Sequence, residues 1–451
     1  MKDRGTDWNS GEPQASTIDR RARIWSVVRV SGGNFLEMYD FTVFGYYAWA
    51  IGKTFFPSGD VFVSLMLSLM TFGVGFLMRP VGSIVLGAYA DKHGRRAGLI
   101  LTMCLMSFGI VSVACVPGYA SIGLLAPLLV VVGRLTQGFS AGMELGAVSV
   151  YLSEISTPGH KGFYVSWQSA SQQVAVMFAA LLGVLLNSAV AAPRMAAWGW
   201  RIPPLVGCLI IPFLLWLRRS LRESYEFAAC RRHPTFREIV RSLASSGRLV
   251  VIATMVFTMT SVSFYMITAY TPTFGSTVLR LSALYVWVVT FCVGASNLVW
   301  IPVMGAVSDR IGRHPLMIAS TVLMAATAYP ALVWLVRAPS FSRLLIVELW
   351  LSFVYGTYNG AAIVFVTEIM PIKIRVMGFS LAYSMAAALF GGFTPAICTY
   401  LIRITRNGAV PGLWLSFAAA CGLAAALIAE RQLVRATPSK PAASRKWTLT
   451  T

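Results

Sequence analysis

The 451-residue chain is 57% hydrophobic and only 12% charged, yet it carries a formal net charge of +20. A soluble protein draws about a quarter of its residues from Asp, Glu, Lys and Arg, so this composition excludes an ordinary soluble domain. The apolar runs are continuous and about 20 residues long, which is the length a helix needs to cross a bilayer. Strands of a membrane barrel would instead alternate in polarity. The sequence therefore predicts an all-α membrane protein.

We predict twelve transmembrane helices in two six-helix bundles. In chain order the spans cover roughly residues 25–51, 60–89, 97–116, 121–149, 162–190, 199–217, 249–273, 282–306, 315–336, 343–366, 376–402 and 411–429. The corresponding parts of the chain are a tail (1–24), a first bundle (25–217), a linker (218–248), a second bundle (249–430) and a tail (431–451).

The connections between the predicted spans alternate in basic charge. The connections that are rich in Lys and Arg are both tails, the Arg-rich segment 218–248 and the loops that hold Lys92, Arg95, Arg96, Lys161, Arg310, Arg313, Lys373 and Arg375. Because basic loops stay on the cytoplasmic side, both termini are predicted to be cytoplasmic. The positive charge then reflects topology, so nucleic acid is not an expected partner. Residues 1–24 are polar and lack the apolar core of a signal peptide.

Cysteine and histidine patterns give no sign of a metal or catalytic centre. The seven cysteines mostly fall inside apolar spans without paired spacing, and the four histidines fall in predicted cytoplasmic loops without ligand spacing. We therefore expect no disulfide framework, no metal, no cofactor and no enzymatic activity.

An internal repeat links the two predicted bundles. The loop after the second span reads G-A-Y-A-D-K-H-G-R-R (87–96), and the loop after the eighth reads G-A-V-S-D-R-I-G-R-H (305–314). A second matching pair follows spans four and ten, with Glu154 before Pro158 and Glu368 before Pro371. Such repeats are typical of transporters that are built from two related halves.

The repeated loop resembles the cytoplasmic signature of the major facilitator superfamily. Four further stretches resemble its metabolite:proton symporter family, namely residues 33–41, 79–82, 133–144 and 198–203. Stretches 151–155, 166–174, 358–361, 367–371 and 378–382 look most similar to the citrate and tricarballylate members. The likeness covers about residues 25 to 430. One departure is Met143, where the wider family has a glycine, and this change could alter helix packing there.

The resemblance implies proton-coupled uptake of a small organic anion across a bacterial inner membrane by alternating access. The implied partners are a di- or tricarboxylate (citrate or tricarballylate favoured), protons and the lipid bilayer, with the proton as coupling ion. Open alternatives are symport of another metabolite (2-oxoglutarate, shikimate, or a zwitterion such as proline or betaine) and a transporter-like sensor.

Charges inside the predicted spans are few, and such charges rarely persist without a partner and a function. They are Glu37, Asp40, Arg79, Arg134, Glu144 and, near an outer end, Glu348. At 1.5 Å per residue, Asp40 and Arg134 both reach about mid-membrane. In the resembled fold their helices face a central cavity, so we predict an Asp40–Arg134 pair. Proton coupling is assigned to Asp40, Arg134, Glu37 and Glu144, and bracing is favoured for Arg79.

Polar residues on other predicted spans are candidates for contacts with substrate carboxylates, since amides and phenols can donate without adding a charge. The candidates are Asn34, Tyr39, Arg134, Gln137, Gln168, Gln172, Tyr355, Tyr358 and Asn359. Interhelical hydrogen bonding is the open alternative for Gln168, Gln172, Tyr358 and Asn359, and it is favoured for Asn297.

Charged loop residues are predicted to act as a gate. The resemblance implies that they lock the two halves together when the outer side is open, without touching substrate. They are Asp91, Arg95, Arg96, Glu154, Asp309, Arg313 and Glu368.

Overall fold

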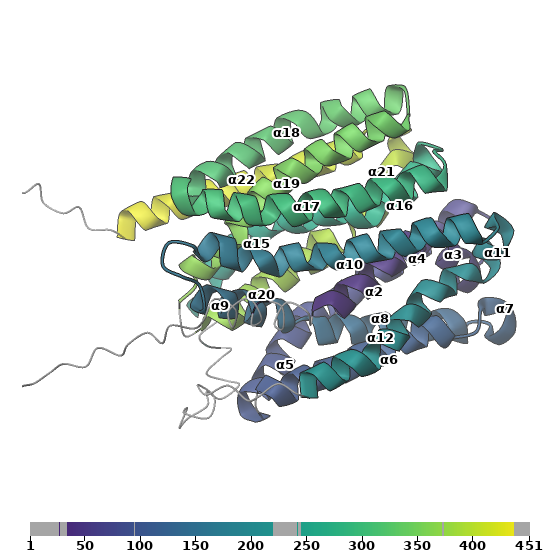
Figure 1. Ribbon diagram of the computed structural model, residues 1–451, viewed down its shortest axis with the longest axis horizontal. Helices are drawn as coiled ribbons and strands as arrows, with labels where there is room; N and C mark the ends of the chain where they lie inside the picture. The colour runs from purple at the N-terminus through teal and green to yellow at the C-terminus, as the bar shows by residue number, and fades with distance from the viewer. Residues whose placement is uncertain are drawn as a thin grey trace, which may run out of the picture.

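The structure of the protein is a computed structural model that describes residues 27, 34–93, 95–219, 241, 245–371 and 374–436. The described part of the chain is helical apart from short connections (Figure 1). Its first part forms α2 (Asn34–Tyr46), α3 (Ala48–Phe55), α4 (Val61–Leu77), α5 (Arg79–His93), α6 (Arg95–Cys115), α7 (Tyr119–Ile122), α8 (Leu125–Ala141), α9 (Glu144–Glu154), α10 (Lys161–Ala189), α11 (Ala192–Ala197), η1 (Gly199–Arg201) and α12 (Ile202–Arg219).

The second part of the chain forms the remaining helices. They are α15 (Gly247–Phe264), η2 (Tyr265–Tyr270), α16 (Thr271–Thr273), η3 (Phe274–Val278), α17 (Ala283–Ile311), α18 (Arg313–Arg337), α19 (Phe341–Ile369), α20 (Arg375–Ala386), η5 (Ala387–Gly391), α21 (Thr394–Thr405) and α22 (Pro411–Ala436). Capping side chains start several of them: Asp60 accepts from the Phe62 amide, and Ser282 and Ser340 cap α17 and α19.

Nine helical stretches in the described residues are long and apolar enough to cross a membrane. They are Val61–Tyr89, Leu125–Glu154, Lys161–Ala189, Gly247–Val278, Ala283–Ile311, Arg313–Arg337, Phe341–Ile369, Arg375–Thr405 and Pro411–Glu430. Two shorter apolar helices, Ile100–Cys115 and Gly199–Pro212, lie on predicted spans as well. The chain is therefore a multi-pass membrane protein.

Several predicted boundaries differ from the helices observed. The helix of the fourth predicted span continues to Glu154, and α22 continues to Ala436 although the predicted bundle ends at 430. Both extensions lie beyond the apolar run, because backbone hydrogen bonds continue a helix past the end of its hydrophobic segment. The tail 1–24 and most of the linker 218–248 lie outside the described residues.

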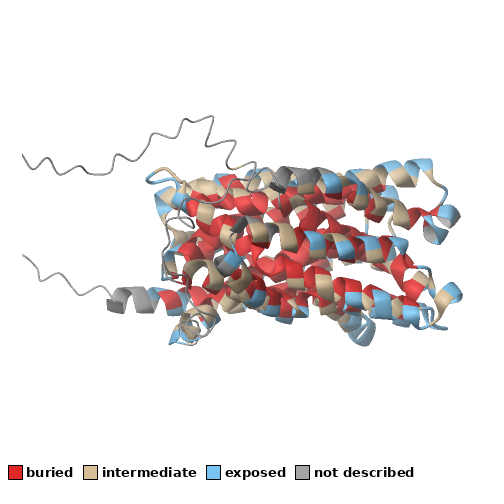
Figure 2. Ribbon diagram, turned by 90° about the horizontal axis from the view of Figure 1, so that it is seen from below, coloured by how far each residue is buried: buried red, intermediate tan, exposed pale blue. Residues whose placement is uncertain are grey.

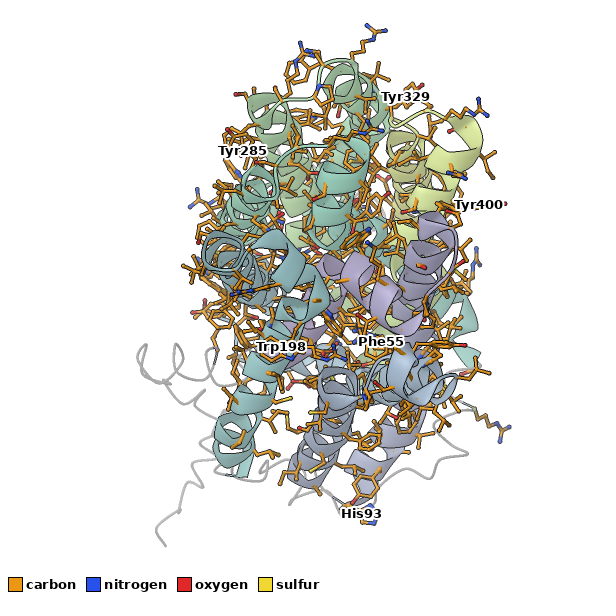
Figure 3. The ribbon with its side chains drawn as sticks, turned by 90° about the vertical axis from the view of Figure 1, so that its right-hand side faces the viewer. Phe55, His93, Trp198, Tyr285, Tyr329 and Tyr400 are labelled. Carbon is orange, nitrogen blue, oxygen red and sulfur yellow. The ribbon has the colours of Figure 1, made fainter. Side chains whose placement is uncertain are left out.

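The helices from the two parts of the chain mostly occupy opposite halves of the bundle. In Figure 1 the green and yellow helices α17, α18, α19 and α22 lie above the purple, blue and teal helices α2, α6, α8 and α12. Seen end-on, Tyr285, Tyr329 and Tyr400 lie on one half, and Phe55 and Trp198 on the other (Figure 3). Helix α10 packs against α17 across the boundary, and buried residues fill the middle of the bundle (Figure 2).

Close backbone contacts hold α4 and α5 against α8. A Cβ placed on Gly138 would lie 1.5 Å from the Gly75 carbonyl oxygen, and one on Gly82 would lie 1.8 Å from the Phe139 carbonyl oxygen. Met143, the departure from the family pattern, sits at the break between α8 and α9 and packs against Leu86. The methionine is therefore accommodated at the end of the helix crossing, while glycines occupy its tightest points.

We predict that Gly138→Val disrupts this crossing, since added side-chain volume in a packed core costs about 1–3 kcal/mol or more. The expected result is a clear fall in the thermal unfolding temperature of the detergent-solubilised protein. Gly59→Val is the matched control, because a Cβ there meets nothing within 4 Å. Equal stability of the two variants would contradict the close-packing account.

Candidate functional site

Two ion pairs lie buried at the centre of the first half. Arg79 Nη2 on α5 is 2.8 Å from Glu37 Oε1, and Arg134 Nη1 on α8 is 2.7 Å from Asp40 Oδ2. The four side chains are at most 7% exposed. Glu37 and Asp40 lie one turn apart on α2, so this single helix supplies both carboxylates. The predicted Asp40–Arg134 pair is therefore present, and Arg79 and Glu37 form a second pair beside it.

Aromatic rings from α2 and α4 surround both guanidinium groups. The guanidinium carbon of Arg79 lies 4.7 Å from the centre of the Phe41 ring and 4.6 Å from that of Phe76. The guanidinium carbon of Arg134 lies 5.0 Å from the centre of the same Phe41 ring and 3.9 Å from that of Phe44. The ring faces attract these cations while keeping water away from them.

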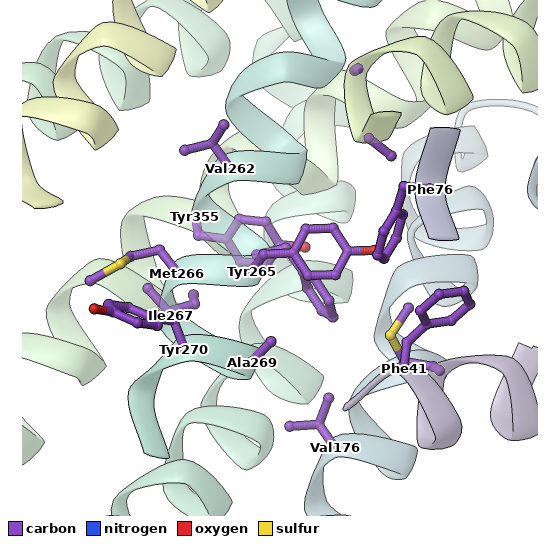
Figure 4. Packing of buried hydrophobic residues seen from close by; sticks show 14 of the residues in the cluster. Phe41, Phe76, Val176, Val262, Tyr265, Met266, Ile267, Ala269, Tyr270 and Tyr355 are labelled. Carbon is purple, nitrogen blue, oxygen red and sulfur yellow. The ribbon is translucent and has the colours of Figure 1, made fainter. Parts of the chain in front are cut away.

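This aromatic shell was not predicted from the sequence. The sequence does contain two features that indicate this shell: Phe41 follows Asp40 directly, and Phe72 and Phe76 are spaced one helical turn apart. From the second half of the protein, Tyr265 approaches Phe76 with 5.1 Å between ring centres (Figure 4). The buried pairs of the first half therefore face a ring of the second half.

The guanidinium groups retain unused donors. Arg134 Nη1 also donates to Gln137 Oε1. Four nitrogens, Nε and Nη1 of Arg79 and Nε and Nη2 of Arg134, are buried without a hydrogen-bond partner among the described residues. Because a buried donor without a partner costs about 1–3 kcal/mol, such atoms suggest a place where another group binds.

Glu144 lies close to the Glu37 carboxylate. The two side chains line one cavity of about 10 Å³, together with Thr102, Ser140 and apolar residues of α6 and α8. That volume is about the minimum that holds one water molecule. Glu144 is therefore placed beside Glu37 rather than beside Asp40.

The predicted substrate contacts fall into two groups. Hydroxyls of the first group donate to backbone carbonyls of other helices, Tyr39 to Pro203 at 2.7 Å and Tyr358 to Val256 at 2.9 Å. For Tyr358 this bond is the interhelical use that the sequence left open, and for Tyr39 it differs from the predicted role. The side chains of the second group are buried and either keep unused hydrogen-bonding atoms or bond only within their own helix. They are Asn34, Gln137, Gln168, Gln172, Tyr355 and Asn359.

A polar chain connects the two halves at the seam between α10 and α17. Asn297 Nδ2 donates to Gln173 Oε1 at 3.4 Å, and Ser352 Oγ on α19 donates to Asn297 Oδ1 at 2.7 Å. Interhelical bonding, favoured for Asn297, is therefore observed. Gln173, which was not among the predicted residues, forms the other side of this contact.

A separate carboxyl group is buried in the second half. Glu348 on α19 is 1% exposed, and its Oε1 accepts from the Thr271 hydroxyl at 3.0 Å. Thr271 follows the π-helical segment η2, where the backbone of this span leaves regular α-helix. The bond therefore fixes the irregular segment to α19.

Asp309 joins the halves at the end of the bundle that is predicted to be cytoplasmic. Its carboxylate accepts from the backbone amides of Gly162 and Phe163, at 2.7 and 3.0 Å, at the start of α10. Arg313 contacts Asp309 at 2.8 Å and Glu368 at 3.2 Å. A carboxylate at a helix N-terminus is favoured by the exposed amides and the helix dipole, so this contact ties α17 to α10.

The structure describes the other predicted gating residues only in part. The side chains of Asp91, Arg95 and Arg96 lie outside the described residues. Glu154 lines a cleft of about 490 Å³ together with Asp309, Arg313 and Glu368. Four predicted members of the gate therefore line this one cleft.

Contacts between the halves also exist at the opposite end. Trp287 at the start of α17 packs against Tyr46 and Tyr47, with 5.1 and 5.6 Å between ring centres. A Cβ on Gly183 would lie 2.4 Å from the Trp287 ring. The buried ion pairs thus lie between two sets of contacts that join the halves.

A multi-pass helical bundle with partnered charges at its centre, and contacts between its halves at both ends, defines a membrane transport protein. Comparisons with known proteins agree. Residues 25–235 match the family described as "Sugar (and other) transporter". A citrate-proton symporter of Klebsiella pneumoniae is 56% identical over 90% of this chain and 91% of its own. A citrate-proton symporter of Salmonella typhi is 53% identical, over 90% and 94% respectively.

Among solved structures, a major facilitator superfamily proton:xylose symporter bound to 6-bromo-6-deoxy-D-glucose superimposes with a TM-score of 0.72. It is 18% identical and the match covers 92% of this chain and 96% of that one, which supports the fold. The chain belongs to the family that includes these two citrate-proton symporters, and its fold is that of a major facilitator superfamily transporter.

We predict that Asp309→Asn loosens the contact between α17 and α10. Losing an ionic acceptor of two amide donors shifts the local equilibrium by about 1–1.5 kcal/mol, which corresponds to about a five- to tenfold change. The readout is alkylation of a cysteine placed at Ser166, which is 1% exposed and packed near Gly305. Labelling by a water-soluble thiol reagent should rise by that factor.

Glu430→Gln is the control for this experiment. Glu430 is exposed on α22, which packs mainly against α18 and α15 of its own half, so the substitution removes a surface carboxylate away from the seam between the halves. It should leave labelling at position 166 unchanged. If Asp309→Asn behaved like Glu430→Gln, the Asp309 contact would not hold this end closed.

Proposed function

We propose that this protein carries out proton-coupled uptake of citrate, or of the related tricarballylate, across a bacterial inner membrane. The two relatives above, at 56% and 53% identity along nearly the whole chain, are both citrate-proton symporters. The observation in the structure that carries the proposal is the buried Asp40–Arg134 pair, because it supplies an acid and a fixed cation at the centre of the bundle.

Coupling follows from competition for Arg134. An incoming carboxylate and the Asp40 carboxylate seek the same guanidinium group, and two anions cannot both occupy a dry site beside one cation at low cost. Protonation of Asp40 releases Arg134 to the substrate. By linkage, each ligand then raises the affinity for the other by the same factor. The inward proton gradient thereby draws the anion inward.

The architecture we propose contains twelve spans in two bundles, 25–217 and 249–430, with cytoplasmic tails and linker 218–248. The halves rock around the central pairs, and the contacts at both ends represent an intermediate with both sides shut. Asp309, Arg313 and Glu368, with Asp91, Arg95, Arg96 and Glu154, form the cytoplasmic gate. This arrangement supports transport rather than an enzymatic reaction, with the proton as the coupling ion and no other cofactor.

The substrate contacts we propose are Arg134 and neighbouring amides and phenols. Gln137 bonds to Arg134 directly, and Asn34, Gln168, Gln172, Tyr355 and Asn359 contribute from α2, α10 and α19. The Tyr39 and Tyr358 hydroxyls already donate to carbonyls, so we assign them to bracing. Glu144 and Glu37 are assigned to proton transfer alongside Asp40.

We predict that Asp40→Asn separates exchange from accumulation. In proteoliposomes with the membrane potential held at zero, each coupled proton gives about tenfold accumulation of the transported anion per pH unit. The wild-type protein should accumulate labelled citrate under an imposed pH gradient. Asp40→Asn should still exchange internal for external citrate, but its accumulation should fall by about tenfold or more.

Glu430→Gln again serves as the control, since it removes one carboxylate from the surface of α22. A competition panel of tricarballylate, 2-oxoglutarate, shikimate and proline in the same vesicles tests the substrate class. Citrate accumulation by Asp40→Asn at the wild-type level would rule out Asp40 as the coupling acid. Displacement of citrate by proline but not by tricarballylate would rule out the substrate assignment.

A further inference from the structure

Arg79 is built like a second binding group rather than a simple brace. A bracing arginine would use its donors within the bundle, but only Nη2 of Arg79 bonds, to Glu37, while Nε and Nη1 have no partner among the described residues. The whole residue is 1% exposed. The same pattern of one engaged nitrogen and two unused ones occurs at Arg134.

The guanidinium groups of both arginines lie near the ring of Phe41. Each guanidinium carbon is within 5.0 Å of the Phe41 ring centre, so the two are at most about 10 Å apart. Like charges at that separation in a dry interior repel each other. The terminal carboxylates of a tricarballylate-like chain are about 5 Å apart, given C–C bonds of about 1.5 Å. One such anion can therefore reach both guanidinium groups.

Charges at the site make protons necessary for that binding. With Glu37 and Asp40 ionised, the two cations are already neutralised, and a polyanion entering a buried site would be left without compensation. With both acids protonated, two guanidinium groups carry unopposed positive charge. Two ionised carboxylates of one anion then restore neutrality and satisfy the unused nitrogens.

We propose that Arg79 and Arg134 together form a clamp for two carboxylates of one substrate anion, and that Glu37 and Asp40 are the two acids that the substrate displaces. This proposal rests on the function proposed above and extends it. Each acid accepts one proton when the substrate takes its arginine and returns it when the substrate leaves. The coupling ratio is then at least two protons for each anion.

The surroundings of both pairs fit this scheme. Among the described residues, the other ionisable side chains near the two pairs come from α2 itself and from four other elements. These are Glu144 on α9, across the small cavity from Glu37, Tyr39 on α2, Cys208 on α12, Tyr265 on η2 and Tyr383 on α20. None of them adds a cation, so Arg79 and Arg134 are the positive groups available to the anion.

One of these groups connects the clamp to the opposite half. Tyr265 packs against the Phe76 ring at 5.1 Å between ring centres, and the Arg79 guanidinium carbon lies 4.6 Å from the centre of that ring. The Tyr265 hydroxyl has no hydrogen-bond partner among the described residues. That hydroxyl can donate to a carboxylate held by Arg79. Occupancy of the clamp would therefore create a contact between the halves, which is what a rocking mechanism requires of its substrate.

The test compares Glu37→Gln, the double variant Glu37→Gln/Arg79→Gln and the surface control Arg337→Gln, whose side chain is exposed in the last turn of α18. The double variant removes both charges of the pair, so it should fold where Arg79→Gln alone would leave a buried charge without a partner. We expect the folded double variant to bind citrate at least about tenfold more weakly than wild type. If Arg79 only braced the bundle, the neutral pair of glutamines would take over that role, and citrate binding would stay at the wild-type level.

Glu37→Gln alone mimics the protonated acid, so it should keep citrate binding and exchange. At zero membrane potential its accumulation per pH unit should fall from about a hundredfold to about tenfold, because one coupled proton is lost. Accumulation at the wild-type level, or wild-type citrate affinity in the double variant, would overturn the clamp. Failure of the wild-type protein to accumulate citrate would instead reject the proposed function itself.

A further variant covers the case in which the double variant does not fold. Arg79→Lys keeps the charge but lacks the forked donors that grip a carboxylate. The clamp predicts that the citrate concentration for half-maximal exchange rises at least about tenfold in Arg79→Lys. An unchanged value would overturn the proposal.

Discussion

A guanidinium group cannot shed its proton in a protein, so an arginine buried in a lipid-embedded bundle must be neutralised by something that is buried with it. Arg79 and Arg134 meet this constraint with Glu37 and Asp40, two carboxylates presented one turn apart by α2. The rings of Phe41, Phe44 and Phe76 exclude water from both pairs. Because the cations are permanent and the acids are not, the site can exchange its own anions for a foreign one only by taking up protons. The proposed transport cycle follows from that asymmetry.

In the proposed cycle, the rest of the bundle makes this exchange accessible from one side at a time. At one end Asp309 caps α10 from α17, and at the other Trp287 packs against Tyr46 and Tyr47. Both contacts involve α17 and the first half, so relative rotation of the halves would strain one contact while it relieves the other. Between them, the Asn297–Gln173 bond crosses the same seam. These contacts are individually weak, and a balanced pair of weak contacts suits a protein that must populate two states of similar free energy.

Much of this arrangement could be predicted from the sequence. The apolar runs predicted the positions of the helices, and scarce buried charges pointed to Glu37, Asp40 and Arg134. The pairing of Arg79 with Glu37 could not be predicted, because contacts between residues on different helices depend on helix rotation that hydropathy does not encode. The same limit applies to Tyr39 and Tyr358, whose hydroxyls turned out to donate to backbone carbonyls. The π-helical segments around Tyr265 were also missed, since a uniformly apolar run looks the same whether its backbone is regular or not.

The central claim is that the anion and the protons share one site, and proton uptake on binding tests it most directly. Purified protein in weakly buffered solution near neutral pH would be mixed with citrate adjusted to the same pH, while the pH change is recorded and corrected for citrate's own ionisation. The account predicts net proton uptake by the protein that saturates with citrate binding, and an affinity that increases as the pH falls. Citrate binding without any proton uptake, at an affinity independent of pH, would contradict it.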